Sequence, residues 1–399
     1  MTCRKREAGD PIMSKEKPII WIMSGESSGD MYGARIAREV MKQNPGAVVR
    51  GMGGHRMREA GVDLFVDSSE LGVVGLVEVL EKIGTFIRIF FQCIELAKTE
   101  RPDVVMVIDN PGFNIRLAKR LWKLGIPVVW FISPQVWVWR KSNIPRIAKY
   151  CRKLIVIFPF ETEVWAGSGL ETHFGGHPLV EIVRERTDPA IKRDPNHILI
   201  LPGSRSSETS RLLEPFLKTV LLLHKRRPEL RFTISLPREK TYRDVMDGLD
   251  KFTRHHPEMQ DVKIEVTQGQ TPRAMQECIA GLAASGTVTV ECAIAGLPLV
   301  VAYRLNYITF ILAIIIIRKL FRNAFTMVDI ILNRKSFEEF LQFQVRPAVL
   351  ADAMERILPG GSRRAEVERD MAELRQMLEA GSQNATANAA RHLLSTIEG

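Results

Sequence analysis

Short, nearly continuous apolar runs alternate along the chain with longer segments in which apolar residues recur every three or four positions. The apolar runs of the first half lie at residues 18–23, 48–52, 103–108, 127–132 and 153–158. Such runs are typical of strands in a parallel sheet that is covered on both faces. Helical periodicity fills the intervals at residues 30–43, 76–99 and 113–124. This order predicts a doubly wound α/β domain at residues 18–185.

The same alternation restarts after a polar, proline-containing stretch at residues 184–196. The apolar run HILIL is followed by a helical pattern at 208–226, and then by the segments RFTISLP, VKIEV, IAGLAAS and PLVVAY. We therefore expect a second nucleotide-fold domain at 186–345, a cleft between the two domains, and a helical tail at 346–399. The tail is expected to pack either on the first domain or on a partner chain, which would make a homodimer.

Composition and charge limit the classes of molecule that the protein is expected to bind. The 399 residues are 45% hydrophobic and 26% charged, as in globular proteins, and the net charge of +10 favours anionic partners. No basic stripe with interleaved aromatic residues is present, so we expect no nucleic acid. The five cysteines form no CxxC pair or Cys/His cluster, which indicates a reducing compartment and no zinc site. Residues 1–17 are polar and are expected to be a disordered leader, with Met13 as an alternative start.

One segment raises the question of a membrane. The run ITFILAIIII at residues 308–317 lies between Arg304 and the cations Arg318, Lys319 and Arg322. It is shorter than the roughly 20 residues that a membrane-spanning helix needs. It is either a buried helix or an apolar helix that lies on a membrane surface. Candidate contacts to acyl chains are Ile311, Leu312 and Ile315 here, and Phe86 and Phe90 in the apolar segment 73–93.

The turn after the first strand, SGESSGD, is rich in glycine but does not fit a dinucleotide site. Its glycines, with Gly33, are spaced by four residues, whereas the dinucleotide fingerprint is G-x-G-x-x-G. The turn is either a tight turn capped by Asp30 or a site for sugar hydroxyls and phosphate formed by Glu26, Ser27 and Ser28.

Further chemistry follows later strands of the first half. Asp109, in DNPGFN, is either a base for a sugar hydroxyl or the start of an Asx turn. In SPQVWVWRK, Trp137 and Trp139 either stack on a sugar or acyl chain or fill the core. His177, in GGHPLV, taken alone, is more often structural.

Two loops of the second half suit a nucleoside diphosphate. In LPGSR, Gly203 permits close backbone approach and Arg205 offers a fork that matches phosphate, although a surface arginine is the alternative. In SGTVTVE, Ser285, Gly286 and Thr287 open a helix that carries Glu291 one turn later. The helix N-terminus suits phosphate oxygens, and the glutamate suits the two hydroxyls of a ribose; a capped helix with a solvated glutamate is the alternative.

The set and order of these motifs resemble the lipid-A-disaccharide synthase family. The motifs are SGESSGD, DNPGFN, SPQVWVWR, FPFE, GHPLV, LPGSR and ASGTVTVE, and the resemblance runs from about Ile19 to about residue 345. It implies a GT-B glycosyltransferase with two Rossmann-like domains. The implied reaction is inverting transfer of 2,3-diacylglucosamine from its UDP derivative to 2,3-diacylglucosamine 1-phosphate, giving a β-1,6-linked disaccharide 1-phosphate and UDP.

The resemblance also implies a set of positions and surroundings. Substrate contacts are expected from both halves: Ser27, Ser28, Asn114, Ser133, Gln135, Trp137, Arg140, His177, Gly203, Ser204, Arg205, Ser285, Gly286, Thr287, Glu291 and Asp329. No cofactor or metal is expected, because Arg205 and helix N-termini can balance the charge of the leaving UDP. The enzyme is expected at the inner face of the cytoplasmic membrane.

Two departures from the family pattern affect these expectations. Gly112 stands where many members carry an acid that is a favoured catalytic base, so we assign the base to Asp109, with Glu26 second. Val328-Asp329 stands where the family often reads Pro-Asn, whereas Glu339 and Gln342 match the family pattern. Alternative functions are another inverting GT-B transfer to a lipid-linked acceptor, or nucleotide-sugar binding without turnover.

Overall fold

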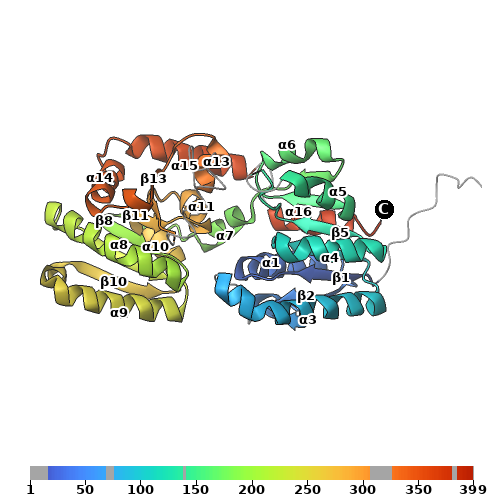
Figure 1. Cartoon of the computed structure of the whole chain (residues 1–399). Helices are drawn as coiled ribbons and strands as arrows, with labels where there is room; N and C mark the ends of the chain where they lie inside the picture. Colours follow the sequence, from blue (N-terminus) through green and yellow to red (C-terminus); the bar gives the residue numbers. More distant parts are fainter. Residues whose placement is uncertain (1–16, 69–75, 138–140, 306–325, 380–383, 399) are drawn as a thin grey trace, which may run out of the picture. The chain divides into compact units, whose positions relative to one another are not determined.

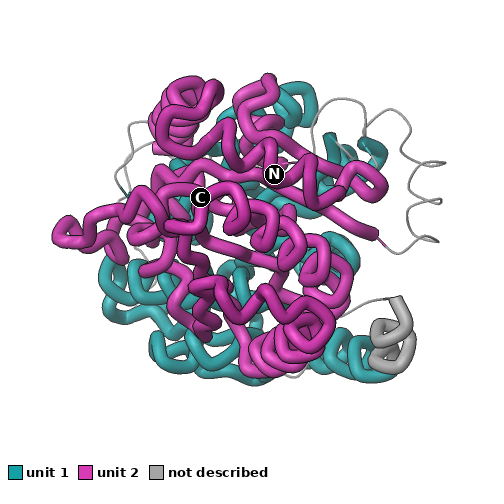
Figure 2. Tube along the Cα trace, turned by 90° about the vertical axis from the view of Figure 1, so that its left-hand side faces the viewer, with its two compact units in different colours: residues 1–178, 380–399 teal, residues 179–379 magenta. Residues whose placement is uncertain are grey.

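The chain folds into two units, each built on one parallel sheet. The computed structural model describes residues 17–68, 76–137, 141–305, 326–379 and 384–398. Unit 1 comprises residues 1–178 and 380–399, and unit 2 comprises residues 179–379 (Figure 2). Helices pack against the sheet of each unit (Figure 1).

Unit 1 contains a seven-stranded sheet in the order β3-β2-β1-β4-β5-β6-β7. Its strands are β1 (Ile19–Met23), β2 (Val48–Gly53), β3 (Asp63–Asp67), β4 (Val104–Ile108), β5 (Val128–Phe131), β6 (Lys153–Val156) and β7 (Glu171–Phe174). Its helices are α1 (Ser27–Gln43), α2 (His55–Glu59), α3 (Leu76–Glu100), α4 (Pro111–Lys123), α5 (Ile144–Tyr150), α6 (Glu161–Trp165) and α16 (Ala385–Leu394), and α7 (Pro178–Arg186) leads into unit 2. All five residues of β4 are buried, as expected for a central strand covered on both faces.

Unit 2 contains a six-stranded sheet in the order β10-β9-β8-β11-β12-β13. Its strands are β8 (Asp194–Leu201), β9 (Arg231–Leu236), β10 (Lys263–Gln268), β11 (Cys278–Ala284), β12 (Leu299–Tyr303) and β13 (Glu338–Leu341). Its helices are α8 (Ser206–Arg226), α9 (Glu239–His255), α10 (Thr271–Glu277), α11 (Thr287–Ile294), α13 (Met327–Leu332), α14 (Pro347–Ile357) and α15 (Arg364–Glu379). Helices α8 and α9 pack side by side, with α9 against β9 and β10 and α8 against β11 (Figure 1).

The helical tail is shared between the two units. Helices α14 and α15 belong to unit 2, whereas α16 packs against α1 of unit 1. Gln43 Nε2 donates to the carbonyl oxygen of Ala387 at 3.1 Å, and Lys153 Nζ donates to Ser395 Oγ at 2.8 Å. Along the chain, the boundaries between the units lie between residues 178 and 179 and between residues 379 and 380. The sequence pattern instead predicts the first boundary after residue 185 and one helical tail at residues 346–399.

Among the helices that the structure describes, none combines the length and apolar character needed to cross a bilayer. The segment with Ile311, Leu312 and Ile315 lies outside the described residues.

Candidate active site

The loops after β1 and β4 touch at the carboxyl edge of the sheet of unit 1. The two strands are paired in parallel, so their carboxyl ends lie side by side. A Cβ atom on Gly25 would lie 2.9 Å from Nδ2 of Asn110, so the first loop passes close to the second. Glu26, Ser27 and Ser28 are exposed on the first loop and in the first turn of α1. This edge therefore brings Glu26 close to Asp109.

Asp109 is held in a strained backbone conformation. Asp109 and Asn110 have φ values of 46° and 43°, in the left-handed region that residues other than glycine seldom adopt. Asn114 supports this turn from beneath, since its Nδ2 donates to the carbonyl oxygens of Asp109 at 2.6 Å and Ile108 at 3.1 Å. Asn114 is buried, so the contact seen for this expected substrate ligand is with the Asp109 turn.

The surroundings of Asp109 favour a proton acceptor that works near neutral pH. Its side chain is exposed, yet the protein atoms around the carboxyl restrict its solvation, and Glu26 adds a like charge. Together these effects raise the pKa of Asp109 to about 6, against a smaller lowering by the N–H of Asn110. A carboxyl group with a pKa in this range is both ionised at pH 7 and a stronger base than an ordinary aspartate.

The glycines of the first turn serve close packing. A Cβ on Gly29 would lie 2.4 Å from Ser24 Oγ, and one on Gly33 would lie 2.8 Å from Met57 Sδ. The four-residue spacing thus places small residues on one face of α1, as expected for close approach rather than for a dinucleotide.

Asp30 does not cap its own helix, and this corrects the expectation from the sequence. Helix α1 begins at Ser27, with Glu26 at the N-cap position and no side-chain capping bond. The Asp30 carboxylate instead accepts hydrogen bonds from the backbone N–H groups of Gly54 at 2.7 Å and Met57 at 3.1 Å, so it caps α2. The N–H groups at the start of α2 attract this carboxylate, a contact between segments far apart in sequence.

The loops after β5 and β6 form a second part of this edge. Ser133 is buried and accepts a hydrogen bond from Trp165 Nε1 at 2.9 Å, whereas Gln135 is exposed and Trp137 is half-buried. His177 is buried, and burial lowers its pKa to about 3, so it is neutral at physiological pH. Arg140 lies outside the described residues.

Helix α3 exposes apolar residues in addition to those expected from the sequence. Phe86 and Phe90 are half-buried against the core of unit 1, and the ring of Phe90 packs edge-on against Phe113 at 5.8 Å. Ile87 and Phe91, one turn apart, are each 53% exposed. Among the side chains of α3 that the structure describes, from residue 84 onward, Ile87 and Phe91 are the large apolar ones most exposed to another molecule.

In unit 2 the loops after β8 and β11 lie next to each other, because these strands are paired in parallel. Gly203 has φ 129°, and a Cβ there would lie 2.6 Å from the Cβ of Glu208, so only glycine fits. The Glu208 carboxylate accepts hydrogen bonds from Ser204 N at 3.1 Å and Arg205 Nη1 at 3.2 Å. An acid thus engages the two donor groups that the sequence indicated for phosphate.

Helix α11 begins directly after the neighbouring strand. Gly286 and Thr287 are exposed and Ser285 is half-buried, so the first turn is accessible. Glu291, one turn further on, makes an ion pair with Arg186 of α7 at 3.4 Å. Burial raises the pKa of Glu291, and the positive charge of Arg186 opposes that rise.

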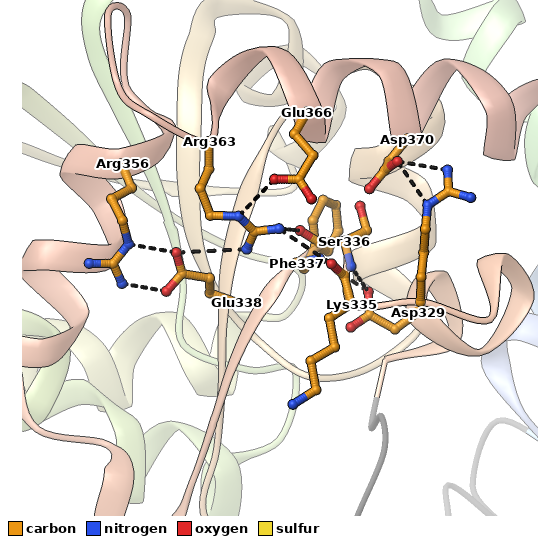
Figure 3. Close-up of polar contacts among 10 residues, drawn as sticks. Asp329, Lys335, Ser336, Phe337, Glu338, Arg356, Arg363, Glu366 and Asp370 are labelled. Atoms are coloured by element: carbon orange, nitrogen blue, oxygen red, sulfur yellow. Dashed lines mark hydrogen bonds and ion pairs between the residues drawn. The ribbon is translucent and has the colours of Figure 1, made fainter.

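Asp329 links α13 to the start of β13 (Figure 3). Its Oδ1 accepts hydrogen bonds from the backbone N–H groups of Ser336 at 3.0 Å and Phe337 at 3.1 Å. Its Oδ2 is buried and has no hydrogen-bond partner among the described residues. Burial, reinforced by the charge of Glu339, raises the pKa of Asp329 to about 7. Where the structure places this residue, its contacts are with the protein backbone.

Ion pairs surround this turn (Figure 3). Arg356 and Arg363 both pair with Glu338, and Arg363 Nη2 also donates to the carbonyl oxygen of Ser336 at 3.1 Å. Arg334 pairs with Asp370 at 2.7 Å. These contacts fix the entry to β13.

Two side chains at and after β13 hold backbone groups of other segments. Glu339 Oε1 accepts a hydrogen bond from Thr326 N at 2.6 Å. Gln342 accepts from Leu305 N at 2.7 Å and donates to Leu305 O at 3.2 Å, while its own φ is 50°. The two residues that match the family pattern therefore fasten Leu305 and Thr326 to one strand.

Three residues of these edges were missed as site residues by reasoning from the sequence. Glu208 engages the LPGSR loop, and its charge raises the pKa of Tyr303, at the end of β12, together with the larger effect of burial. Glu161, at the start of α6, lies beneath the loop after β5. The signal for Glu161 was an acid four residues before a tryptophan, which places both on one face of a helix.

The two sheet edges offer different chemical groups. Unit 1 offers a carboxylate base beside hydroxyl groups, and unit 2 offers an arginine and two helix N-termini suited to phosphate. Within the described parts of the chain, no group of three or more His, Cys, Asp or Glu residues is placed to hold a metal ion.

Solved structures with the same architecture act on or bind sugars. The UDP-GlcNAc 2-epimerase of Neisseria meningitidis, bound to UDP-GlcNAc, superposes with a TM-score of 0.63 at 12% identity, covering 95% of this chain and 100% of that chain. A glycotransferase of kitacinnamycin superposes with a TM-score of 0.61 at 15% identity, covering 95% and 99%. These likenesses confirm the GT-B architecture expected from the sequence.

Sequence relatives identify the family. The lipid-A-disaccharide synthase of Trichlorobacter lovleyi is 33% identical over 386 residues, which are 95% of this chain and 97% of that protein. The enzyme of the same name from Geobacter sulfurreducens is 37% identical over 303 residues, 73% and 76% of the two chains. The family model described as lipid-A-disaccharide synthetase matches residues 20–393. The chain therefore belongs to the lipid-A-disaccharide synthetase family of glycosyltransferases.

Proposed function

We propose that the protein transfers 2,3-diacylglucosamine from UDP-2,3-diacylglucosamine to the 6-hydroxyl of 2,3-diacylglucosamine 1-phosphate. The products are the β-1,6-linked disaccharide 1-phosphate and UDP. Family membership supports the overall reaction. The observation that carries the mechanism is Asp109, exposed in a strained turn and raised in pKa by its surroundings and Glu26.

The reaction is a single displacement. Asp109 accepts the proton of the acceptor hydroxyl as its oxygen bonds to the anomeric carbon of the donor. The bond from that carbon to the UDP oxygen breaks on the opposite face, which inverts the configuration. Because Gly112 carries no side chain, Asp109 is the carboxylate of the DNPGFN turn. Glu26 raises the basicity of Asp109 through its negative charge.

Unit 2 binds the leaving group. Arg205 and the exposed N-termini of α8 and α11 supply positive charge and N–H donors to the pyrophosphate of the donor. The Glu291 carboxylate accepts hydrogen bonds from the hydroxyl groups of the ribose. No metal ion is part of this scheme.

The membrane surface is where both acylated substrates are found, so we place the protein on the inner face of the cytoplasmic membrane. Ile87 and Phe91, exposed on α3, are suited to contact acyl chains. Co-sedimentation with anionic vesicles measures this contact, and the double variant I87S/F91S is expected to reduce it. A homodimer stays a prediction, which light scattering of the purified protein would test.

The decisive experiment is the reaction itself. The protein is incubated with the UDP-diacylglucosamine donor and the diacylglucosamine 1-phosphate acceptor, and UDP and disaccharide are measured. Asp109→Asn is expected to reduce turnover by at least about 100-fold while UDP affinity is retained. Absence of product with two acyl-chain lengths would refute the proposed reaction, and near-normal turnover of Asp109→Asn would refute the base.

A further inference from the structure

Two buried side chains of helix α6, Glu161 and Trp165, contact residues of the loop after β5. Glu161 and Trp165 lie one turn apart on this helix, so they share a face. Trp165 Nε1 donates to Ser133 Oγ at 2.9 Å, and Ser133 Oγ donates in turn to the carbonyl oxygen of Pro134 at 3.0 Å. Glu161, 1% exposed, accepts a hydrogen bond from Phe158 N at 3.3 Å. Residues of the loops after β5 and β6 thus meet around one carboxyl group.

A stack of aromatic rings lies over the same place. The ring of Trp137 packs edge-on against Phe160 at 5.2 Å, and Phe160 stacks on Phe158 at 5.9 Å. Phe158 in turn contacts the buried His177 ring at 5.3 Å. Trp137 and Phe160 are half-buried, so part of the stack is accessible to another molecule.

The indole N–H of Trp137 lies near the carboxyl group of Glu161. This N–H is buried and makes no hydrogen bond to any described residue within the usual distance limits. Yet Trp137 and Ser133 are among the groups that favour the ionised carboxyl of Glu161, so the indole lies on the side of that carboxyl. A modest movement of either side chain would form the missing hydrogen bond, which a buried donor requires.

Glu161 is mostly protonated at neutral pH. Burial raises its pKa to about 8, and the N–H of Phe158 and the neighbouring donors oppose this rise only in part. A protonated carboxyl group both donates and accepts a hydrogen bond, so it can join two loops that each present polar groups.

We propose that Glu161 is a positioning residue for the acceptor: it joins the loops after β5 and β6 and holds the Trp137 stack in the orientation that receives the acylated acceptor. Strand β5 lies between β4 and β6, so these loops follow the Asp109 loop along the same edge of the sheet. Aromatic rings with a few placed polar groups are typical of ligand sites, and the exposed Gln135 lies two residues before Trp137. This inference rests on the proposed function.

The experiment compares Glu161→Gln and Glu161→Ala with the control Glu163→Gln, an exposed acid on the same helix. At pH 7, Glu161→Ala is expected to raise KM for the acceptor at least about tenfold and to change KM for the donor less than about threefold. Glu161→Gln, a neutral isostere, and the control are expected to stay close to wild type.

The pH dependence of kcat/KM for the acceptor distinguishes a positioning role of Glu161 from a role in packing alone. As pH rises through about 8, Glu161 loses its proton in the wild type, and kcat/KM for the acceptor is expected to fall. Glu161→Gln cannot ionise, so it should lose this alkaline decline. The fluorescence of Trp137, obtained as the difference between the wild type and Trp137→Phe, is expected to change near the same pH. The same difference measured in the Glu161→Gln background is expected to show no such change.

Each outcome decides the inference. An unchanged acceptor KM in folded Glu161→Ala overturns it, and so does an alkaline decline that persists unaltered in Glu161→Gln. If Glu161→Ala does not fold, the pH profile of Glu161→Gln decides alone. If the wild type forms no disaccharide, the proposed function fails, and the fluorescence titration still tests the contact between Glu161 and Trp137.

Discussion

The side-chain amide of Asn114 donates a 2.6 Å hydrogen bond to the backbone carbonyl of Asp109. This bond supports a turn whose φ values cost free energy, so its loss should let Asp109 leave its working orientation. Asn114→Ala is expected to lower kcat about ten- to 100-fold and the free energy of unfolding by about 1–3 kcal/mol. Steady-state kinetics and urea unfolding measure both. Turnover equal to that of a control outside the Asp109 turn, the half-buried Asn143→Ala, would show that Asn114 does not hold the base in place.

Removing the charge of Glu26 should change the pH dependence of the reaction. The wild-type rate is expected to rise as pH passes about 6, because Asp109 must lose its proton to act as the base. Glu26→Gln removes a like charge, lowers the pKa of Asp109, and should move this rise to lower pH. If Glu26 is the base instead, Glu26→Gln abolishes turnover at every pH and Asp109→Asn keeps the acid limb.

Replacing Arg205, in the LPGSR loop, and replacing Glu208, just after it, should change the affinity for UDP in opposite directions. Arg205→Ala removes a cation and is expected to weaken UDP binding about ten- to 100-fold. Glu208→Gln removes the acid that now accepts from Ser204 N and Arg205, so it should tighten UDP binding. Calorimetric titration in the presence and absence of a metal chelator measures these affinities. Weaker binding by Glu208→Gln would mean that the acid orders the loop and does not compete with phosphate.

Asp329 should make stability depend on pH. Its folded-state pKa is about 7 and its ordinary value is 3.8, so the folded protein holds a proton that the unfolded chain releases. The stability from this proton is present below about pH 4 and is lost as pH rises to about 7, a change of order 2–4 kcal/mol. Asp329→Asn keeps an oxygen for Ser336 N and should be more stable than wild type at pH 8. Parallel stability curves of the two proteins from pH 5 to 8 would contradict this.

Reasoning from the sequence located the central strands well and the edge strands poorly. Strands β1, β4 and β8 are apolar runs because both faces are covered, and their burial marks them in the sequence. Strands β7 (ETHF) and β13 (EEFL) were missed, since edge strands are half-buried and carry polar residues. Their place is set by pairing with β6 and β12, which no local pattern reveals.

The candidate site was predictable where a motif follows a central strand. Asp109 and Glu26 were each placed in a loop after a strand, and the structure shows that the two strands are neighbours and that their loops meet. The partner of Asp30 was not predictable, because the N–H groups of Gly54 and Met57 approach it only after the chain has crossed the sheet. Contacts of this kind depend on the fold and leave no spacing signal.

The return of α16 to unit 1 has a consequence for the newly made chain. Unit 2 is continuous in sequence, so it can close once its last residue has left the ribosome. The face of α1 that α16 covers stays open until residues 385–394 have been made, although α1 is synthesised before all of unit 2. Native unit 1, which carries Asp109, is therefore completed only after unit 2 has been synthesised. During translation, the proposed base does not reach its native surroundings before the half that binds UDP has been made.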